Sequence, residues 1–333
     1  MNNGQIGRLW QITQGQDECD ISGKAIATGG FDSPGRRCGA STPVPKCCVR
    51  KNADLSNLIS RFAVMIDSLR FSSAAVLLTA VIHLSSIDTS AQDWTRFRGP
   101  NGNGVVEGTN FPTEWSEDDY AWQTELPGQG HSSVVTYGGR GFLMSGDPQT
   151  AIRHVLAIDL NSGKILWQRN YESKTHRLHR RNSFGSSTPA VDTNGLYVAW
   201  SSPNETVIKA LSHDGEERWS RNLGTWTSQH GFGTSPIIAG GKLILFNSQQ
   251  KDQLPAGATV GESRMMAFDP KTGETIWESP TNTTRVCYSV PCVREIADGG
   301  IELVCCNTGN GIFGMDIETV SYTHLTLPTR LMV

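Results

Sequence analysis

The sequence has no hydrophobic run long enough to cross a membrane. Its longest largely apolar stretch covers residues 71–84, whereas a membrane-spanning helix needs about 20 residues. Charge is also sparse, since charged residues make up 18% of the 333 residues and the net charge is −3, which disfavours a nucleic-acid-binding protein. Hydrophobic residues still make up 37%, so the chain can form a sizeable core and is not fully disordered.

Several motifs of enzymes and metal sites are also missing. The chain has no P-loop and no GxGxxG motif, and its eight cysteines form no CxxC pair, so no metal site is predicted. The order of Ser, His and Asp along the chain gives no evidence for a catalytic triad. The one basic run, residues 174–181, has no interleaved aromatic residues; it is more typical of a solvated loop than of a nucleic-acid patch.

The N-terminal region differs from the rest of the chain. Residues 1–64 carry a net charge of +3 and show no sustained period, so we expect a disordered leader or translated sequence upstream of the true start. Met65, the apolar run 71–84 and the small residues 89–91 fit a secretory signal peptide over residues 65–91; a buried helix is the alternative. The sequence thus predicts an exported protein, periplasmic or extracellular, without a stable membrane span.

The C-terminal residues 320–333 break the pattern that precedes them. They resemble a translated transposase adaptor from sequencing libraries, and we expect this segment to be an artefact. The natural sequence would then end near Glu318, and His324 and Arg330 would have no functional role.

An internal repeat organises residues 92–319, which hold 27 of the 35 glycines. Three segments align, and each ends in a tryptophan: residues 155–167, 207–219 and 265–277. A fourth segment begins at residue 312. The tryptophans are spaced by 52 and 58 residues, a period typical of propellers or solenoids. The expected structural repeat residues are Asp159, Gly163, Trp167, Trp219, Asp269, Gly273 and Trp277.

Each segment has the pattern of a hairpin. Short apolar runs alternate as half-buried strands do, and the glycine between them supplies a positive φ. We expect the three tryptophans to be structurally equivalent, largely buried, and placed on the last strand of their units against the adjacent unit. A second strand–turn–strand element precedes each hairpin, beginning at Ser132, Ser187, Ser235 and Ser289. Two hairpins give four strands per unit, which is a propeller blade; a β-helix solenoid, with its shorter rungs, ranks second.

The repeat A-x-D-x-x-T-G-x-x-x-W resembles the pyrroloquinoline-quinone (PQQ) type β-propeller repeat. Residues 157–167 and 267–277 carry it well, whereas the second unit has Ser212 in place of Asp. Residues 93–104 resemble the opening of exported bacterial PQQ-like propeller proteins, common in planctomycetes. Because that family has seven or eight blades, the resemblance implies an all-β chain forming a partial β-propeller of about four four-stranded blades. The last blade would end before its fourth strand and expose Ile301, Leu303 and Ile312.

The resemblance implies two candidate functions. The first is an exported, non-catalytic binding or scaffold module that needs no cofactor, similar to the propeller subunit of the outer-membrane β-barrel assembly machinery. The alternative is a PQQ-dependent dehydrogenase that oxidises alcohols or sugars. Those enzymes use a disulfide between adjacent cysteines, which Cys305 and Cys306 match in spacing. Adjacent strand residues point to opposite faces, which favours ordinary strand cysteines, with Cys287 or Cys292 as bridging partners.

The loops that lead into each blade are the best site candidates. His131, Asn182 and His230 occupy the same place in their repeats, and equivalent loops of a propeller converge on one face. The three side chains could bind a small anion or a sugar-like ligand, so a protein or small-molecule partner is expected on that face. The alternative is that they bond to loop backbone and hold the blades together.

Overall fold

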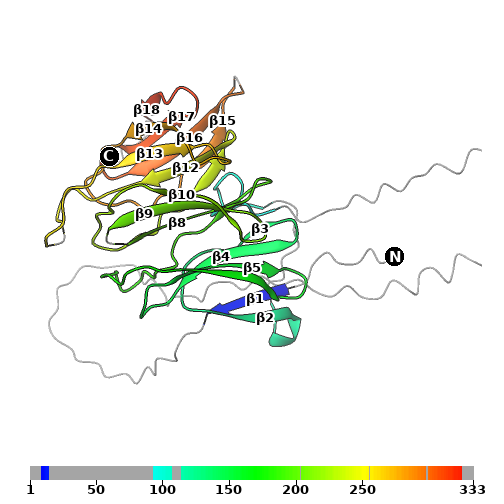
Figure 1. Cartoon of the computed structure of the whole chain (residues 1–333). Helices are drawn as coiled ribbons and strands as arrows, with labels where there is room; N and C mark the ends of the chain where they lie inside the picture. Colours follow the sequence, from blue (N-terminus) through cyan, green and yellow to red (C-terminus); the bar gives the residue numbers. More distant parts are fainter. Residues whose placement is uncertain are drawn as a thin grey trace, which may run out of the picture.

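The computed structural model describes residues 93–106, 114–202, 204–254, 256–297 and 299–324, together with the backbone of Leu9–Gln14. The predicted signal peptide, residues 65–91, and Arg330 lie outside these ranges. The described part is almost entirely β, with four four-stranded antiparallel sheets stacked as the blades of a partial propeller, as predicted (Figure 1).

Each blade is a meander whose strands follow one another in the chain. Blade 1 contains β3 (Val135–Tyr137), β4 (Arg140–Gly146), β5 (Arg153–Asp159) and β6 (Ile165–Tyr171). Blade 2 contains β7 (Ala190–Val191), β8 (Leu196–Ser202), β9 (Glu205–Leu211) and β10 (Glu217–Asn222). Blade 3 contains β11 (Ile237–Ala239), β12 (Lys242–Asn247), β13 (Arg264–Phe268) and β14 (Thr275–Pro280). Blade 4 contains β15 (Cys292–Glu295), β16 (Ile301–Asn307), β17 (Gly311–Asp316) and β18 (Tyr322–His324).

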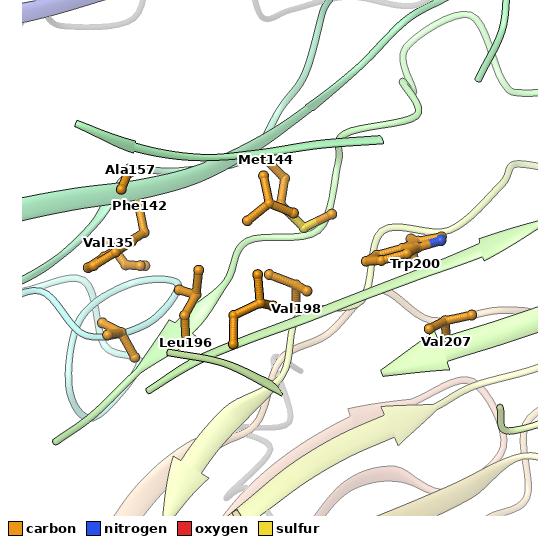
Figure 2. Close-up of a cluster of buried hydrophobic side chains, with 11 residues drawn as sticks. Val135, Phe142, Met144, Ala157, Leu196, Val198, Trp200 and Val207 are labelled. Atoms are coloured by element: carbon orange, nitrogen blue, oxygen red, sulfur yellow. The ribbon is translucent and has the colours of Figure 1, made fainter. Parts of the chain in front are cut away.

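The middle strands are buried on both faces because each blade is packed between two neighbours. All seven residues of β8 are buried. Leu196, Val198 and Trp200 pack toward blade 1, as Figure 2 shows, whereas Tyr197 and Ala199 pack toward blade 3. This alternation explains why the middle strands read as continuous apolar runs, while the outer strands alternate between half-buried and exposed residues.

The three tryptophans of the repeat make the same contact between blades. The indole Nε1 of Trp167 donates to the carbonyl of His213 at 2.8 Å, and that of Trp219 donates to the carbonyl of Pro270 at 3.0 Å. Trp277 donates to the carbonyl of Ile317 at 3.1 Å. Each tryptophan thus lies on the last strand of its blade and reaches the last turn of the next blade. They are half-buried rather than largely buried. Each lies on an outermost strand, so the next blade covers one side of the ring and the other side faces solvent.

A glycine in each receiving turn lies directly against the indole ring. A Cβ atom on Gly215 would lie 2.7 Å from Trp167, and one on Gly273 would lie 2.6 Å from Trp219. Both glycines also have a positive φ, 83° and 73°, which other residues adopt at a cost. The turn therefore needs glycine both for its positive φ and for the close approach of the indole ring. We call the packing of each tryptophan on the glycine of the next turn the Trp–Gly contact.

One further tryptophan belongs to the same series and was not predicted. Trp122 lies on β2 (Tyr120–Leu126), which precedes blade 1, and its Nε1 donates to the carbonyl of Leu160 at 2.9 Å. Its ring lies 2.5 Å from the position of a Cβ on Gly163. β2 therefore covers blade 1 as an outer strand covers the blade that follows it.

Aspartates shape three of these turns, and they are Asp159, Asp269 and Asp316. The Asp159 carboxylate accepts hydrogen bonds from the backbone of Asn161 and Ser162, and Asp269 does the same for Lys271 and Thr272. The hydroxyl of Ser162 also donates to Asp159, which lowers the pKa of that carboxyl. In blade 2 the hydroxyl of Ser212 takes the place of the carboxylate, so the departure from the repeat leaves the turn intact.

Residues 93–102 cross the inner strands of several blades. Thr136 of blade 1 exchanges two hydrogen bonds with Trp94, and Val191 of blade 2 donates to the carbonyl of Thr95 at 2.9 Å. On blade 4, Arg96 donates to the carbonyl of Pro291, and Val293 donates to that of Asn101. Arg96 is only 2% exposed, and burial lowers its pKa to about 10. The segment therefore ties three blades together near the centre of the propeller.

Three expectations concern the ends of the chain. β1 (Leu9–Gln14) pairs in parallel with β2, so these six residues form a strand, and a disordered leader over residues 1–64 stays a prediction. The place of the missing fourth strand of blade 4 is taken by β18, which is formed by residues of the segment expected to be an adaptor artefact, and Thr323 occupies the position of the repeat tryptophan. Leu303, expected to be exposed, is fully buried because it faces blade 3, whereas Ile312 is 38% exposed.

The described residues contain one short 3-10 helix, Glu117–Asp119, and no helix among them has the length and apolar character needed to span a membrane.

The Trp–Gly contact can be separated from backbone strain by two glycine substitutions. Gly273→Ala and Gly241→Ala both place a side chain at a positive φ, 73° and 71°, which costs roughly 1–2 kcal/mol. Only Gly273 lies against a tryptophan, because a Cβ on Gly241 would have no neighbour within 4 Å. Chemical denaturation should show a clearly larger loss of stability for Gly273→Ala. Equal losses would mean that the indole contact contributes nothing.

The blade 4 turn contains a valine where the other turns have glycine. Val320 follows Asp316 as Gly163 follows Asp159, and its φ is 59°. Val320→Gly should stabilise the protein by less than about 1 kcal/mol, because the relief of strain exceeds the added entropy of the unfolded chain together with the packing that the half-buried side chain loses. Thermal denaturation measures the difference, with the exposed Val105→Gly as a control that should not stabilise. A lower midpoint for Val320→Gly would refute this explanation.

Candidate functional site

Four loops that lead into the blades meet around one cavity of about 410 Å³. These entry loops are residues 127–134, 172–189, 223–236 and 281–291, and each connects an outer strand to the inner strand of the next blade. The cavity, which we call the entry cavity, is lined by His131, His179, Arg181, Asn182, Ser186, His230, Gly233 and Tyr288. Every entry loop therefore contributes at least one lining residue.

The structure brings together the three residues singled out from the sequence. His131 comes from the loop before blade 1, Asn182 from the loop before blade 2 and His230 from the loop before blade 3, and all three line the entry cavity. Their equivalent places in the repeat explain this, because entry loops leave the same end of each antiparallel sheet. That they bind a ligand stays a prediction.

Asn182 holds two entry loops together. Its side-chain Nδ2 donates to the carbonyls of His230 at 2.6 Å and Phe232 at 3.3 Å, while its Oδ1 accepts from the hydroxyl of Ser186 at 2.5 Å. These bonds use most of the hydrogen-bonding capacity of the amide. Asn182 therefore has the alternative role expected from the sequence: it bonds to loop backbone and holds neighbouring loops together.

His131 and His179 each use Nδ1 for a hydrogen bond within the loops, which leaves Nε2 for a ligand. Nδ1 of His131 bonds to the hydroxyl of Ser183 at 2.9 Å. Nδ1 of His179 accepts the backbone N–H of Arg181 at 3.2 Å, so the proton of its neutral ring lies on Nε2, which can donate. The rings of His179 and His230 meet edge to face with centroids 5.1 Å apart.

Sequence reasoning missed His179, Arg181 and Tyr288 as lining residues. The first two belong to the basic run 174–181, which was interpreted as a solvated loop, yet that run immediately precedes Asn182 in the same entry loop. Tyr288 precedes the blade 4 element at Ser289. Its hydroxyl donates to the carbonyl of Gly231 at 2.9 Å, and burial raises its pKa. Position within an entry loop was the signal that could have found all three.

A second, much smaller cavity lies between blades 1 and 2. Its volume of about 10 Å³ leaves room for about one water molecule. Arg153 lines it, donating to the carbonyl of Ser201 at 2.9 Å and lying 4.6 Å from the ring centroid of Phe184. Burial lowers the pKa of Arg153 to about 10. This arginine ties blade 1 to blade 2 and does not form a ligand site.

Neither the adjacent cysteines nor a cluster of metal ligands lies at the entry cavity among the described residues. Cys305 is buried between blades 3 and 4 whereas Cys306 is exposed, so the two thiols face opposite sides of β16, and neither lines the entry cavity. The bridges considered with Cys287 or Cys292 are not formed, since all four described cysteines are free. No group of three or more His, Cys, Asp or Glu among the described residues could hold a metal ion.

The fold is similar to those of several solved structures. BamB from Moraxella catarrhalis is 16% identical with a TM-score of 0.39, and the match covers 60% of this chain and 52% of that one. Quinohemoprotein alcohol dehydrogenase from Comamonas testosteroni is 16% identical with a TM-score of 0.39, covering 59% of this chain and 34% of that one. A europium-containing methanol dehydrogenase is 18% identical with a TM-score of 0.34, covering 46% and 25%. The chain thus spans about half or less of the length of these proteins.

A comparison with curated proteins finds no match. The family model described as outer membrane protein assembly factor BamB matches residues 151–319, which include the outer half of blade 1, blades 2 and 3, and blade 4 as far as β17. Because this match spans just over half of the chain, the chain belongs to this family of PQQ-like β-propeller proteins.

Proposed function

We propose that this protein is an exported, non-catalytic binding module whose ligand occupies the entry cavity. The observation that carries the proposal is the convergence of all four entry loops on one cavity of about 410 Å³. That volume lies within the range of roughly 300–1,000 Å³ typical of small-molecule sites. Side chains from four separate blades can then act on one ligand.

The loops around the cavity are held in place before any ligand arrives. His131 and Ser132 both donate backbone N–H groups to the carbonyl of Gly185 at 3.0 Å. The Tyr288 hydroxyl bonds to Gly231, and the Asn182 amide bonds to the same loop. A preformed site avoids the ordering cost of binding, which supports a binding role.

The chemistry of the lining residues supports a non-catalytic role. The closest approach to a catalytic pair is the bond between Ser183 and His131. No carboxylate lines the cavity to orient that imidazole, whereas a serine nucleophile needs a base that a third group holds in place. Without an orienting group, this pair serves to fix the loops.

Export is supported by two independent features. The apolar run 71–84 has the length and flanks of a signal peptide, and the description of the family names the outer membrane. We propose a periplasmic or extracellular location on these grounds.

Ligand-observed NMR with a panel of anionic, neutral and cationic small molecules tests the binding role. Wild-type protein should give hits that Gly233→Phe abolishes, because the added ring occupies the cavity beside Tyr288. Asn161→Phe adds the same ring to an exposed turn away from the entry cavity and should leave the hits unchanged. Circular dichroism verifies that both variants fold. Hits that survive Gly233→Phe would refute the assignment of the cavity.

Titration with PQQ separates the binding module from the dehydrogenase. We expect no alcohol oxidation with an artificial electron acceptor when PQQ and a divalent metal ion are supplied, because neither adjacent cysteine lines the entry cavity and the described residues hold no cluster of metal ligands. Stoichiometric binding together with PQQ-dependent turnover would establish the alternative function and exclude a purely non-catalytic role.

A further inference from the structure

The entry cavity has a one-sided charge. Arg181 and three histidines line it, and no aspartate or glutamate does. The entry loop of Arg181 also carries Lys174, Arg177 and Arg180, against a single carboxylate, Glu172. None of these basic residues forms an ion pair with a described carboxylate. The cavity therefore presents uncompensated positive charge to a ligand.

The guanidinium of Arg181 is the main unused donor at this site. Arg181 is exposed, and its side chain forms no hydrogen bond or ion pair with the described residues. Its backbone is fixed on both sides: its own N–H donates to His179, and the next N–H, of Asn182, donates to the carbonyl of His179 at 2.8 Å. An arginine on such a fixed loop can bind with little loss of backbone freedom.

The geometry of a guanidinium selects the ligand chemistry. Its planar fork matches the two oxygens of a carboxylate or phosphate group, and imidazole N–H groups add further donors to such an anion. Nε2 of His179 is one such donor, since Nδ1 accepts a backbone N–H.

The cavity also offers apolar surface next to these donors. The hydroxyl of Tyr288 is used by the carbonyl of Gly231 and the hydroxyl of Ser228, which fixes its aromatic ring at the cavity wall. Gly233 has no side chain beyond its backbone, and a Cβ there would lie 3.1 Å from the Tyr288 ring. A ligand with an apolar body can therefore lie against Tyr288 while its anionic end reaches Arg181.

We propose that the entry cavity binds a small organic acid, with the oxyanion at Arg181 and the histidines and the apolar body beside Tyr288. This inference rests on the proposed binding role of the cavity and adds the chemical class of the ligand. It also specifies Arg181 as the residue that distinguishes an anion from a neutral molecule.

NMR titration with benzoate, phenyl phosphate and benzamide tests the proposal at low ionic strength. Benzamide has nearly the shape of benzoate without its charge, so wild-type protein should bind benzoate or phenyl phosphate at least about tenfold more tightly than benzamide. The stronger of the two anions identifies carboxylate or phosphate as the natural group. Salt should weaken binding of the anions and leave that of benzamide unchanged.

Arg181→Gln and Arg180→Gln form a matched pair of variants. Each removes one positive charge from the same loop, but only Arg181 lines the cavity. Arg181→Gln should weaken binding of the preferred anion at least about tenfold, and Arg180→Gln should change it less than twofold. Equal effects of the two variants, equal affinity for benzamide, or no binding of either anion would overturn the proposal. Neutral or cationic ligands could instead bind to the wild-type protein and lose their binding in Gly233→Phe. In that case the binding role stands and only the proposed ligand class is wrong.

Discussion

Blades 1, 2 and 3 are sheets that are apolar on both faces, and this constraint determines how the blades stack. The sheet β7–β10 carries Leu196 and Val198 on one face and Tyr197 and Ala199 on the other. It therefore needs a neighbour on each side to bury both faces. The blades therefore stack in chain order. The same requirement accounts for β2, which lies outside blade 1 and contributes Leu126 to a cluster with Leu143, Leu156 and Ile158 of that blade.

The two ends of the blades differ in function: one end joins neighbouring blades, and the other carries the entry loops. The Trp–Gly contacts and the aspartate turns lie where the third and fourth strands connect, and each joins one blade to the next. Antiparallel strands place the entry loops at the opposite end of each sheet. Because packing between the blades is secured by the turns, the entry loops are free to carry polar residues such as His131, Arg181 and His230 around the entry cavity.

Repeated features could be predicted from the sequence, and features that depend on distant partners could not. The spacing of Trp167, Trp219 and Trp277 gave the blades, and the shared place of His131, Asn182 and His230 gave their common cavity. Trp122 was missed because β2 has no preceding hairpin to mark it as a repeat. His179 and Arg181 were missed because charge alone describes a solvated loop. They line the cavity beside Asn182, whose side chain bonds to His230, a partner 48 residues away in the sequence.

The segment 93–102 adds a connection that nearest-neighbour stacking does not provide. Stacked blades contact only their neighbours, so small errors in angle accumulate from blade to blade. This segment bonds to Thr136, Val191 and Val293, which fixes blade 1 relative to blade 4 directly. Glycine is required beside its buried arginine, because a Cβ on Gly102 would collide with the guanidinium of Arg96. A cavity formed by four separate blades keeps its shape only if the blades keep their angles. The segment therefore supports the geometry of the entry cavity without lining it.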